Sequence, residues 1–265
     1  MTASTAPSVS LRPRRRAALR SVLAVELRDE LLAIAREPTA LFFSVLMPVL
    51  FFAMFVGLFG GEVSGVGGLP VGTTMLATFG AYGVVAATLM NPGIGLAEAR
   101  DRGWLRVLKV SPTPLPLTLG AKVLATLPFC VGILTAMTGA AAALGVLQIT
   151  LLQWLALCAI LVVGSVPFAL VGLTVGALAS PNATTAVLNA VIIPMAIASG
   201  LWFPLEILPE WMGGLAPLMP TYHLSQLATG VLGDGAGWAG HLASLVGFSA
   251  LAAVAASLAY RRSRT

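Results

Sequence analysis

The sequence predicts an all-α integral membrane protein with six transmembrane helices and both termini on the cytoplasmic side. The first observation is composition: 58% of the 265 residues are hydrophobic, 9% are charged, and mean hydropathy is +0.94. A soluble domain has about a quarter of its residues charged. The second observation is that residues 63–97 and 123–205 contain no charged side chain. Because so few residues are charged, the polar surface is too small to face water on all sides. We therefore expect lipid to surround most of the chain.

The spanning elements are expected to be helices. A hydrocarbon core of roughly 30 Å requires about 20 apolar residues per helix, and both uncharged segments are long enough for that. A β-barrel would show short segments in which polar and apolar residues alternate, and these segments do not alternate. A helix also satisfies its own backbone hydrogen bonds, which lipid cannot do.

The distribution of charge predicts the topology. Every Lys and Arg lies within residues 12–36, 100–122 or 261–264, and short basic loops mark the cytoplasmic side of a membrane protein. An even number of spans must therefore separate these segments, which requires residues 123–205 to cross three times before one last span. The segments left on the outer side contain Glu62, Glu206, Glu210 and Asp234 and no basic residue. Because the basic clusters flank spans, a nucleic-acid partner is not expected.

The N-terminal part should contain a disordered basic tail and then a helix in the membrane interface. Residues 1–18 are polar, Pro-rich and Arg-rich, without a hydrophobic period. Residues 19–37 fit an amphipathic helix that ends before Pro38. Its apolar face comprises Leu23, Leu27, Leu31 and Ile34. The alternative is a short soluble helix that merely precedes the membrane.

The remaining elements follow in order. The spans are expected at residues 39–59, 72–97, 123–147, 151–178, 184–203 and 239–260. A basic loop at residues 98–122 separates the second span from the third, and Asn91-Pro92-Gly93 should kink or unwind the second span near its inner end. An external segment at residues 204–237 should contain short helices that begin near Pro209 and Pro220. These helices either dip into the outer leaflet or form an extracellular cap.

No catalytic motif is found. The chain has no G-x-S-x-G, no H-E-x-x-H and no G-x-x-x-x-G-K-[ST] sequence, so it should not bind ATP by the P-loop route. The spans contain almost no ionisable side chain, whereas a proton- or sodium-driven pump usually keeps one as a relay. His241, near the outer end of the last span, is interpreted as an interfacial polar residue. Cys130 and Cys158 lie in apolar segments and are not expected to pair.

Polar residues inside the spans are candidates for a substrate path. Asn91 and Asn189 are the two selected, and the alternative for each is an interhelical hydrogen bond, worth about 0.6 kcal/mol on average. Gly57/Gly61 and Gly172/Gly176 have the G-x-x-x-G spacing that lets two helices approach closely.

Three motifs, taken in order, resemble those of the type-2 ABC transporter permeases, in particular the drug-resistance and antibiotic exporters. The first is Arg36-Glu37-Pro38, followed by a span that contains Pro48. The second is Glu98-x-x-x-Arg102-Gly103-x-Leu105-x-x-Leu108-x-x-Ser111-Pro112, followed by Gly120-x-Lys122. The third is Phe203-Pro204-Leu205-Glu206-x-x-Pro209-x-Trp211, followed by Pro220-x-Tyr222. One departure is Trp104, because a threonine commonly follows the loop glycine in that family.

The resemblance implies a permease that is joined to a separate ATPase subunit, forms a homodimer and exports its substrate from the bacterial inner membrane. The partner, not this chain, would hold ATP and Mg²⁺, and this chain would be non-catalytic. The basic loop would press on the ATPase, with Glu98, Arg100, Arg102, Gly103, Trp104, Leu105, Arg106, Leu108 and Lys109 as contact residues. The external segment would be marked by Pro204, Glu206, Pro209, Trp211 and Tyr222.

The expected function is export of an amphipathic substrate such as a drug, an antibiotic or a lipid, powered by the ATPase partner. Alternatives are an exporter of a polysaccharide or glycolipid, and a membrane scaffold that transports nothing and recruits a cytosolic partner. The basic loop itself has a simpler interpretation, in which it only sets topology and contacts lipid headgroups.

Overall fold

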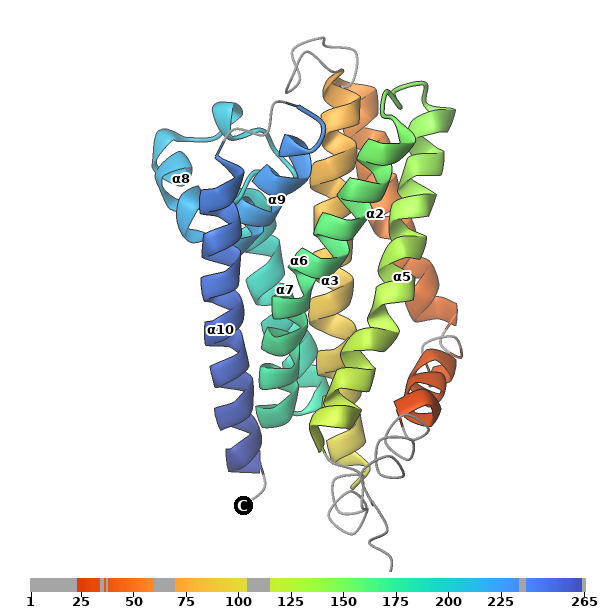
Figure 1. The fold of residues 1–265 in the computed structure, drawn as a ribbon, viewed down its shortest axis with the longest axis vertical. Helices are drawn as coiled ribbons and strands as arrows, with labels where there is room; N and C mark the ends of the chain where they lie inside the picture. The colour runs from red at the N-terminus through yellow and green to blue at the C-terminus, as the bar shows by residue number, and fades with distance from the viewer. Residues whose placement is uncertain are drawn as a thin grey trace, which may run out of the picture.

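A computed structural model describes residues 23–33, 36, 38–59, 70–103, 115–233 and 237–263. The regular elements in this part of the chain are all helical (Figure 1). A helix at residues 23–33 precedes the long helices α2 (Pro38–Phe59), α3 (Val71–Asp101), α5 (Leu115–Ala143), α6 (Leu151–Leu178), α7 (Pro181–Ala198) and α10 (Trp238–Ser263). Four short helices lie between α7 and α10: η2 (Leu205–Ile207), α8 (Glu210–Leu215), η3 (Ala216–Leu218) and α9 (Pro220–Gly230).

The predicted all-α integral membrane fold is confirmed. Among the described residues, five helices are long and apolar enough to cross a membrane, namely α3, α5, α6, α7 and α10, and α2 contains a shorter apolar stretch, Val45–Phe59. The whole of α2 has 22 residues, or about 33 Å of helix at 1.5 Å per residue, which is close to the thickness of a hydrocarbon core. These six helices stand side by side along the long axis of the molecule (Figure 1).

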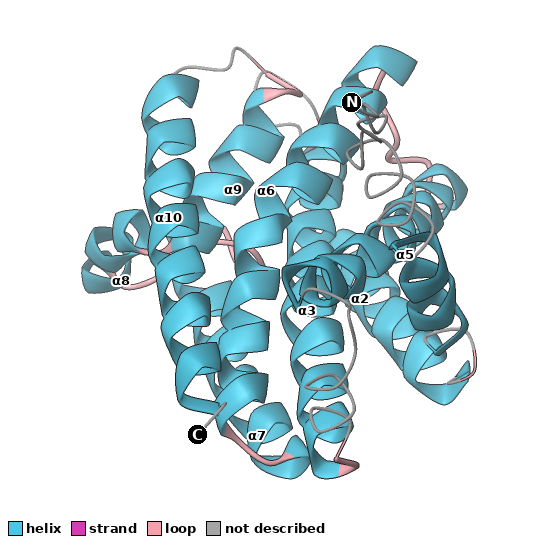
Figure 2. Ribbon diagram, turned by 60° about the horizontal axis from the view of Figure 1, so that its bottom comes forward, coloured by secondary structure: helices cyan, strands magenta, loops and turns pink. Residues whose placement is uncertain are grey.

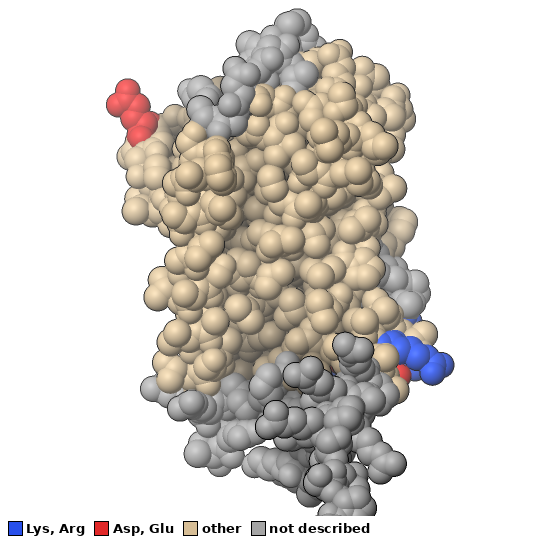
Figure 3. All heavy atoms as spheres, in the orientation of Figure 1, with Lys and Arg blue, Asp and Glu red and all other residues tan. Residues whose placement is uncertain are grey.

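Charged side chains lie toward the two ends of the bundle (Figure 3). In this view acidic atoms project near α8 at one end, Lys and Arg lie at the opposite end with some acidic atoms beside them, and the broad middle zone between them shows no charge. We call the first end the α8 end. We call the other the basic end, where α3 ends and α5 begins and which carries Arg28, Arg100, Arg102 and Lys122. An uncharged zone between two charged ends is the surface that a lipid bilayer requires.

The central helix is α3, which packs against α2, α5, α6, α7 and α9. Its contact with α6 is made through glycine. A Cβ atom added at Gly172 would overlap the carbonyl oxygen of Leu89, and one added at Gly176 would overlap that of Gly93. The predicted close approach at Gly172/Gly176 is therefore present, because only glycine lets the two backbones touch. Gly57 has no neighbour within 4 Å of such an atom, and Gly61 lies outside the described residues.

Two predictions about α3 and the loop after it are corrected. The helix is continuous through Asn91-Pro92-Gly93 as far as Asp101, so it is not unwound there. The close packing of Gly93 on α6 supports the backbone where Pro92 removes a hydrogen bond. The loop expected at residues 98–122 is shorter, since α5 already begins at Leu115. Pro116 is tolerated there because the first turn of a helix does not need its N–H groups.

Glycines in the left-handed region end two helices earlier than the sequence indicated. α5 ends at Ala143 rather than near residue 147, just before Gly145 with φ +71°. α7 ends at Ala198 rather than near residue 203, just before Gly200 with φ +78°. A glycine with positive φ is the usual terminator of a helix, because it avoids the Cβ clash of other residues.

The short helix α9 packs into the bundle. It contacts α3, α6 and α10 (Figure 2), and its buried residues are Thr221, Leu224, Ser225, Leu227, Ala228 and Thr229. A Cβ atom added at Gly164, halfway along α6, would collide with Leu224. The helix expected from Pro220 is therefore present, and its Leu224 reaches the middle of α6.

Candidate functional site

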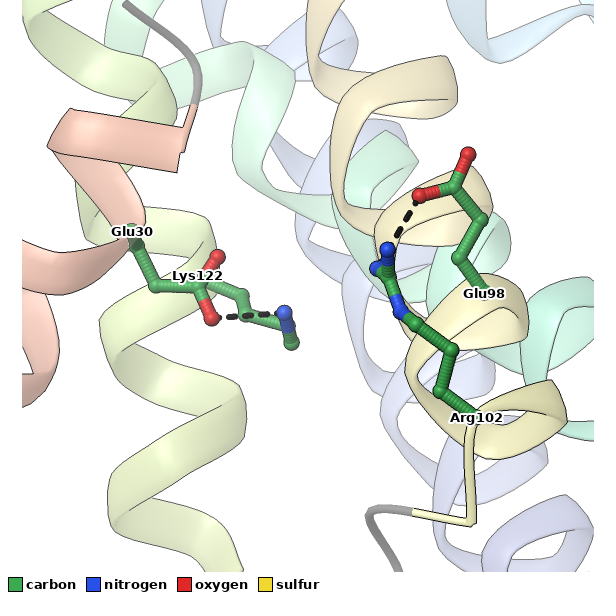
Figure 4. A network of polar contacts seen from close by, with 4 residues as sticks. All are labelled: Glu30, Glu98, Arg102 and Lys122. Atoms are coloured by element: carbon green, nitrogen blue, oxygen red, sulfur yellow. Dashed lines mark hydrogen bonds and ion pairs between the residues drawn. The ribbon is translucent and has the colours of Figure 1, made fainter. Parts of the chain in front are cut away.

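The candidate site is the basic end of the bundle, where residues from four helices meet. Glu98, Arg100 and Arg102 stand on the last turn of α3 and just past it. Lys122 lies in α5, and the helix at residues 23–33 packs beside it through Glu30. Figure 4 shows the two ion pairs that these residues form.

Arg100 fixes the end of α3 to the end of α6. Its Nη1 atom donates hydrogen bonds to the carbonyl oxygens of Gly176, at 2.8 Å, and Ala179, at 3.1 Å. Gly176 lies in the last turn of α6 and Ala179 directly follows the helix, where carbonyl groups have no N–H partner within the helix. A guanidinium at this position also meets the negative end of the helix dipole. Arg100 therefore caps α6 and is engaged inside the protein.

Arg102 has the opposite environment. Its Nη2 atom lies 3.3 Å from Glu98 Oε2, one helical turn back, and its side chain is 73% exposed. An exposed pair at this spacing contributes only about 0.3–0.5 kcal/mol. The side chain of Arg102 is therefore accessible from solution and held weakly.

Gly103 ends α3 and turns the chain. Its φ is +76°, and its N–H group donates to the carbonyl oxygen of Arg100 at 2.9 Å. A side chain at this position would strain the backbone. The next candidates in the predicted contact loop, Trp104, Leu105, Arg106, Leu108 and Lys109, lie outside the described residues.

Lys122 joins α5 to the helix at residues 23–33. Its Nζ atom lies 2.6 Å from Glu30 Oε1, and the side chains of the two residues are 7% and 22% exposed. A Cβ atom added at Gly95 would lie 3.9 Å from the same Nζ, so the ammonium group also lies against α3. A buried ammonium needs such a partner, because removing it from water is costly. Sequence reasoning placed Lys122 at the end of the loop motif and missed Glu30 as its partner.

A second carboxylate stands near the same lysine. The pKa of Glu26 is raised, first because burial removes water from the carboxylate and then because Glu30 and Asp29 repel it, while Lys122 acts in the opposite sense. Two acidic residues one helical turn apart, Glu26 and Glu30, were the signal in the sequence that could have suggested a buried cation here.

The two asparagines proposed for a substrate path lie on different helices. Asn91 is half-buried on α3, directly before Pro92. Asn189 is half-buried on α7, and its Nδ2 atom donates to the carbonyl oxygen of Thr185 at 3.0 Å. The hydrogen bond of Asn189 is thus made within its own helix, not between helices as the alternative interpretation expected.

The external candidates stand at the α8 end. Pro204 precedes η2, which contains Glu206, and Pro209 precedes α8. Trp211 on α8 is 65% exposed. Tyr222 on α9 contacts the ring of His241 with centroids 5.7 Å apart, so it joins α9 to α10.

Within the described ranges there is no group of three or more His, Cys, Asp or Glu side chains that could hold a metal ion. Cys130 and Cys158 are both buried and free.

Comparison with known proteins gives two matches. Residues 22–232 match the profile of a protein family described as ABC-2 type transporter. A protein of Bacillus subtilis (strain 168), provisionally named transport permease YvfS, is 21% identical over 194 residues, which cover 73% of this chain and 78% of that protein. The family match includes the helix at residues 23–33, the basic end and α9.

Proposed function

The chain belongs to the ABC-2 type transporter family, and we propose that it is the membrane subunit of an ATP-driven exporter of an amphipathic substrate. Family membership makes it a multi-pass membrane protein and a transport permease subunit. Permeases of this family typically pair with an ABC ATPase. The substrate proposed here is a drug, an antibiotic or a lipid, and the direction proposed is out of the cell.

The observation that supports this proposal is that polar contacts connect both ends of the loop after α3 to neighbouring helices. Arg100 connects the end of α3 to α6, and Lys122 connects the start of α5 to the helix at residues 23–33. A force applied to residues 104–114 would therefore reach several helices at once. Coupling of this kind needs contiguous packed or hydrogen-bonded elements between the two sites.

The proposed mechanism assigns the energy source to the partner. ATP and Mg²⁺ would bind between two ATPase subunits, and their closure would move the loop after α3. The membrane helices would then shift between inward-open and outward-open arrangements, as packed helices do in domain closure. Two copies of this chain would form the pathway at their interface, with Asn91 and Asn189 as lining candidates. This chain would contribute no catalytic residue to ATP hydrolysis.

The test reverses charge at Arg102 and Arg106 in the complex reconstituted with its ATPase. We expect the double variant Arg102→Glu/Arg106→Glu to keep its fold and lose most of the transport that ATP hydrolysis drives. A reversed charge repels the surface that an arginine would contact, and Arg102 is exposed with only a weak internal pair. The measurement is the ratio of substrate moved to ATP hydrolysed in vesicles.

The control is Glu210→Lys, which reverses an exposed charge at the α8 end and should leave this ratio unchanged. Transport that survives intact in the Arg102→Glu/Arg106→Glu variant would refute the coupling role of this loop.

Two alternative functions can be distinguished from the proposed one by an ATPase assay. An exporter of a polysaccharide or glycolipid would show ATPase stimulation by that substrate and not by hydrophobic drugs. A membrane scaffold that transports nothing would show no stimulation by any substrate in the reconstituted complex. The same ATPase assay therefore separates the three functions.

A further inference from the structure

The chain contains two histidines, and the fold brings them together. His223 lies on α9 and His241 on α10, and their Nδ1 atoms are 2.9 Å apart. The labelled helices α8 and α9 and the start of α10 lie at one end of the bundle, and α3 ends at the other (Figure 1). The sequence analysis interpreted His241 as an interfacial polar residue, and the structure adds that its ring contacts His223.

The hydrogen bonds fix which nitrogen carries each proton in the neutral pair. His223 Nε2 lies 2.9 Å from the carbonyl oxygen of Pro217, and a carbonyl can only accept, so His223 Nε2 must carry a proton. Neutral His223 then has a lone pair on Nδ1, and the proton between the rings must belong to His241 Nδ1. The Nε2 atom of neutral His241 then carries the lone pair of that ring.

The histidine pair can bind a first proton and keep the hydrogen bond between the two rings. A second proton can bind only if this hydrogen bond breaks. The first proton binds His241 Nε2, and the charged ring still donates from Nδ1 to His223, now in a stronger, charge-assisted bond. A second proton would have to bind His223 Nδ1. Two N–H groups would then face each other, and two cationic rings would lie with centroids 5.2 Å apart.

The described residues around the two rings offer little to offset that repulsion. Tyr222 contacts both rings, with centroids 5.5 Å from His223 and 5.7 Å from His241. In the described part of the chain, neither histidine forms an ion pair with a carboxylate. The packed elements α6 and η3 contain no charged residue, the charges of α3 are at its far end, and α8 contributes Glu210.

The pair is also coupled to the position of α9. Leu224, the residue after His223, is fully buried and fills the space left by Gly164 in the middle of α6. A displacement of His223 from α10 would therefore pull Leu224 from this site. α9 packs on α3, α6 and α10 together, so its movement would change contacts among three helices.

We propose that His223 and His241 form a proton-operated latch at the outer side of the protein. The latch holds the start of α9 against α10 while the pair carries no extra proton or one, and it releases α9 when the pair carries two. Acidic medium outside the cell is the signal that it detects. A metal site is less well supported, because metal centres use three or more protein ligands and the described residues supply no third one.

The first test observes the two rings directly in the full-length protein. The chain is purified without a histidine tag, with ¹⁵N-labelled histidine, in lipid nanodiscs, so that its NMR spectrum contains two imidazoles only. We expect one Nε2–H and one Nδ1–H tautomer at neutral pH, with a scalar coupling across the N–N hydrogen bond. On acidification the coupling should survive the first protonation step and vanish in the second.

The second test measures amide hydrogen exchange of residues 220–230, corrected for the intrinsic effect of pH. Protection should fall at least about tenfold in acid in the native protein. His241→Asn keeps a donor near the Nδ1 position but cannot titrate, and it should keep that protection. Thr229→Ser, a mild change on the same helix, serves as the matched control and should behave like the native protein.

Three results would overturn the latch. The first is independent titration of the two rings without a coupling. The second is equal loss of α9 protection in native and His241→Asn protein. The third is a stoichiometric shift of both ring signals by Zn²⁺, which would assign the pair to metal binding. Neither test measures transport, so failure here is independent of the proposed exporter function.

Discussion

Two arginines at the end of α3 show how position decides the role of a side chain. Arg100 donates to two carbonyl oxygens of α6, whereas Arg102, two residues later, is 73% exposed. A helix turns by about 100° per residue, so these side chains point to different neighbours. Arg100 is therefore a structural cap, and Arg102 is the better candidate for contact with a partner.

A pH dependence is expected from Glu26. Its pKa is raised in the folded protein from the ordinary value of 4.5, so folding disfavours the charged form. The contribution of the neutral Glu26 carboxyl to folding stability is complete below pH 4.5, and it is lost as pH rises through the raised pKa. Glu26→Gln should therefore remove this loss and increase protection of residues 23–33 at neutral pH. Hydrogen exchange between pH 4.5 and pH 7 measures it.

Arg28→Gln is the control for Glu26→Gln, because it removes a charge from an exposed position on the same helix. Equal protection of residues 23–33 in native and Glu26→Gln protein at neutral pH would contradict the expectation.

At the scale of elements, the ion pair between Lys122 and Glu30 joins the helix at residues 23–33 to α5. Lys122→Glu would put a third carboxylate beside Glu30 and Glu26 in a half-buried site, and should weaken docking of this helix by about 1–3 kcal/mol, less than for a fully buried pair. The exchange Lys122→Glu/Glu30→Lys should restore much of the loss. Limited proteolysis of residues 23–33 reports docking, and a double-mutant cycle gives the pairwise energy.

If the exchanged variant is cleaved as readily as Lys122→Glu alone, the pair does not hold the helix. Transport coupling in the same variants tests whether docking also matters for the proposed function.

The contact between α3 and α6 makes a sharper prediction. Gly172→Ala places a methyl group against the carbonyl oxygen of Leu89, and backbone cannot move aside as a flexible side chain can. We expect a loss of about 1–3 kcal/mol or more, the usual cost of overpacking, seen as a lower denaturation midpoint in detergent. Gly132→Ala on α5 has no neighbour within 4 Å and should be neutral or slightly stabilising.

A Gly172→Ala protein as stable as the Gly132→Ala protein would mean that α3 and α6 are farther apart than described.

At the scale of the whole molecule, the charge asymmetry predicts opposite compartments for the two ends. In a protein with Cys130 and Cys158 replaced by alanine, Trp211→Cys and Arg102→Cys supply two exposed thiols. A membrane-impermeant maleimide added to intact cells should label residue 211 and not residue 102. Permeabilised cells should show labelling of both.

Labelling of both positions from outside would reject the six-span topology, because it would place the α8 end and the basic end in one compartment.

The sequence by itself determined the class, the family and the distribution of charge. Hydropathy and charge describe how each residue interacts with water or lipid, and they can be assigned without knowing how the helices pack. Long uncharged segments and basic ends therefore predict a helical membrane protein. The helices expected after Pro209 and Pro220 followed from local rules of the same kind. The family motifs are also linear, and a match over residues 22–232 confirms the family.

Only the tertiary structure decided which residues meet. The pairs Arg100–Gly176, Lys122–Glu30 and His223–His241 join helices that the sequence could not place side by side. In lipid, one apolar helix face resembles another, so hydropathy does not specify partners. The contacts that do specify them are a few glycines and buried polar groups, and these act only once the helices are in register.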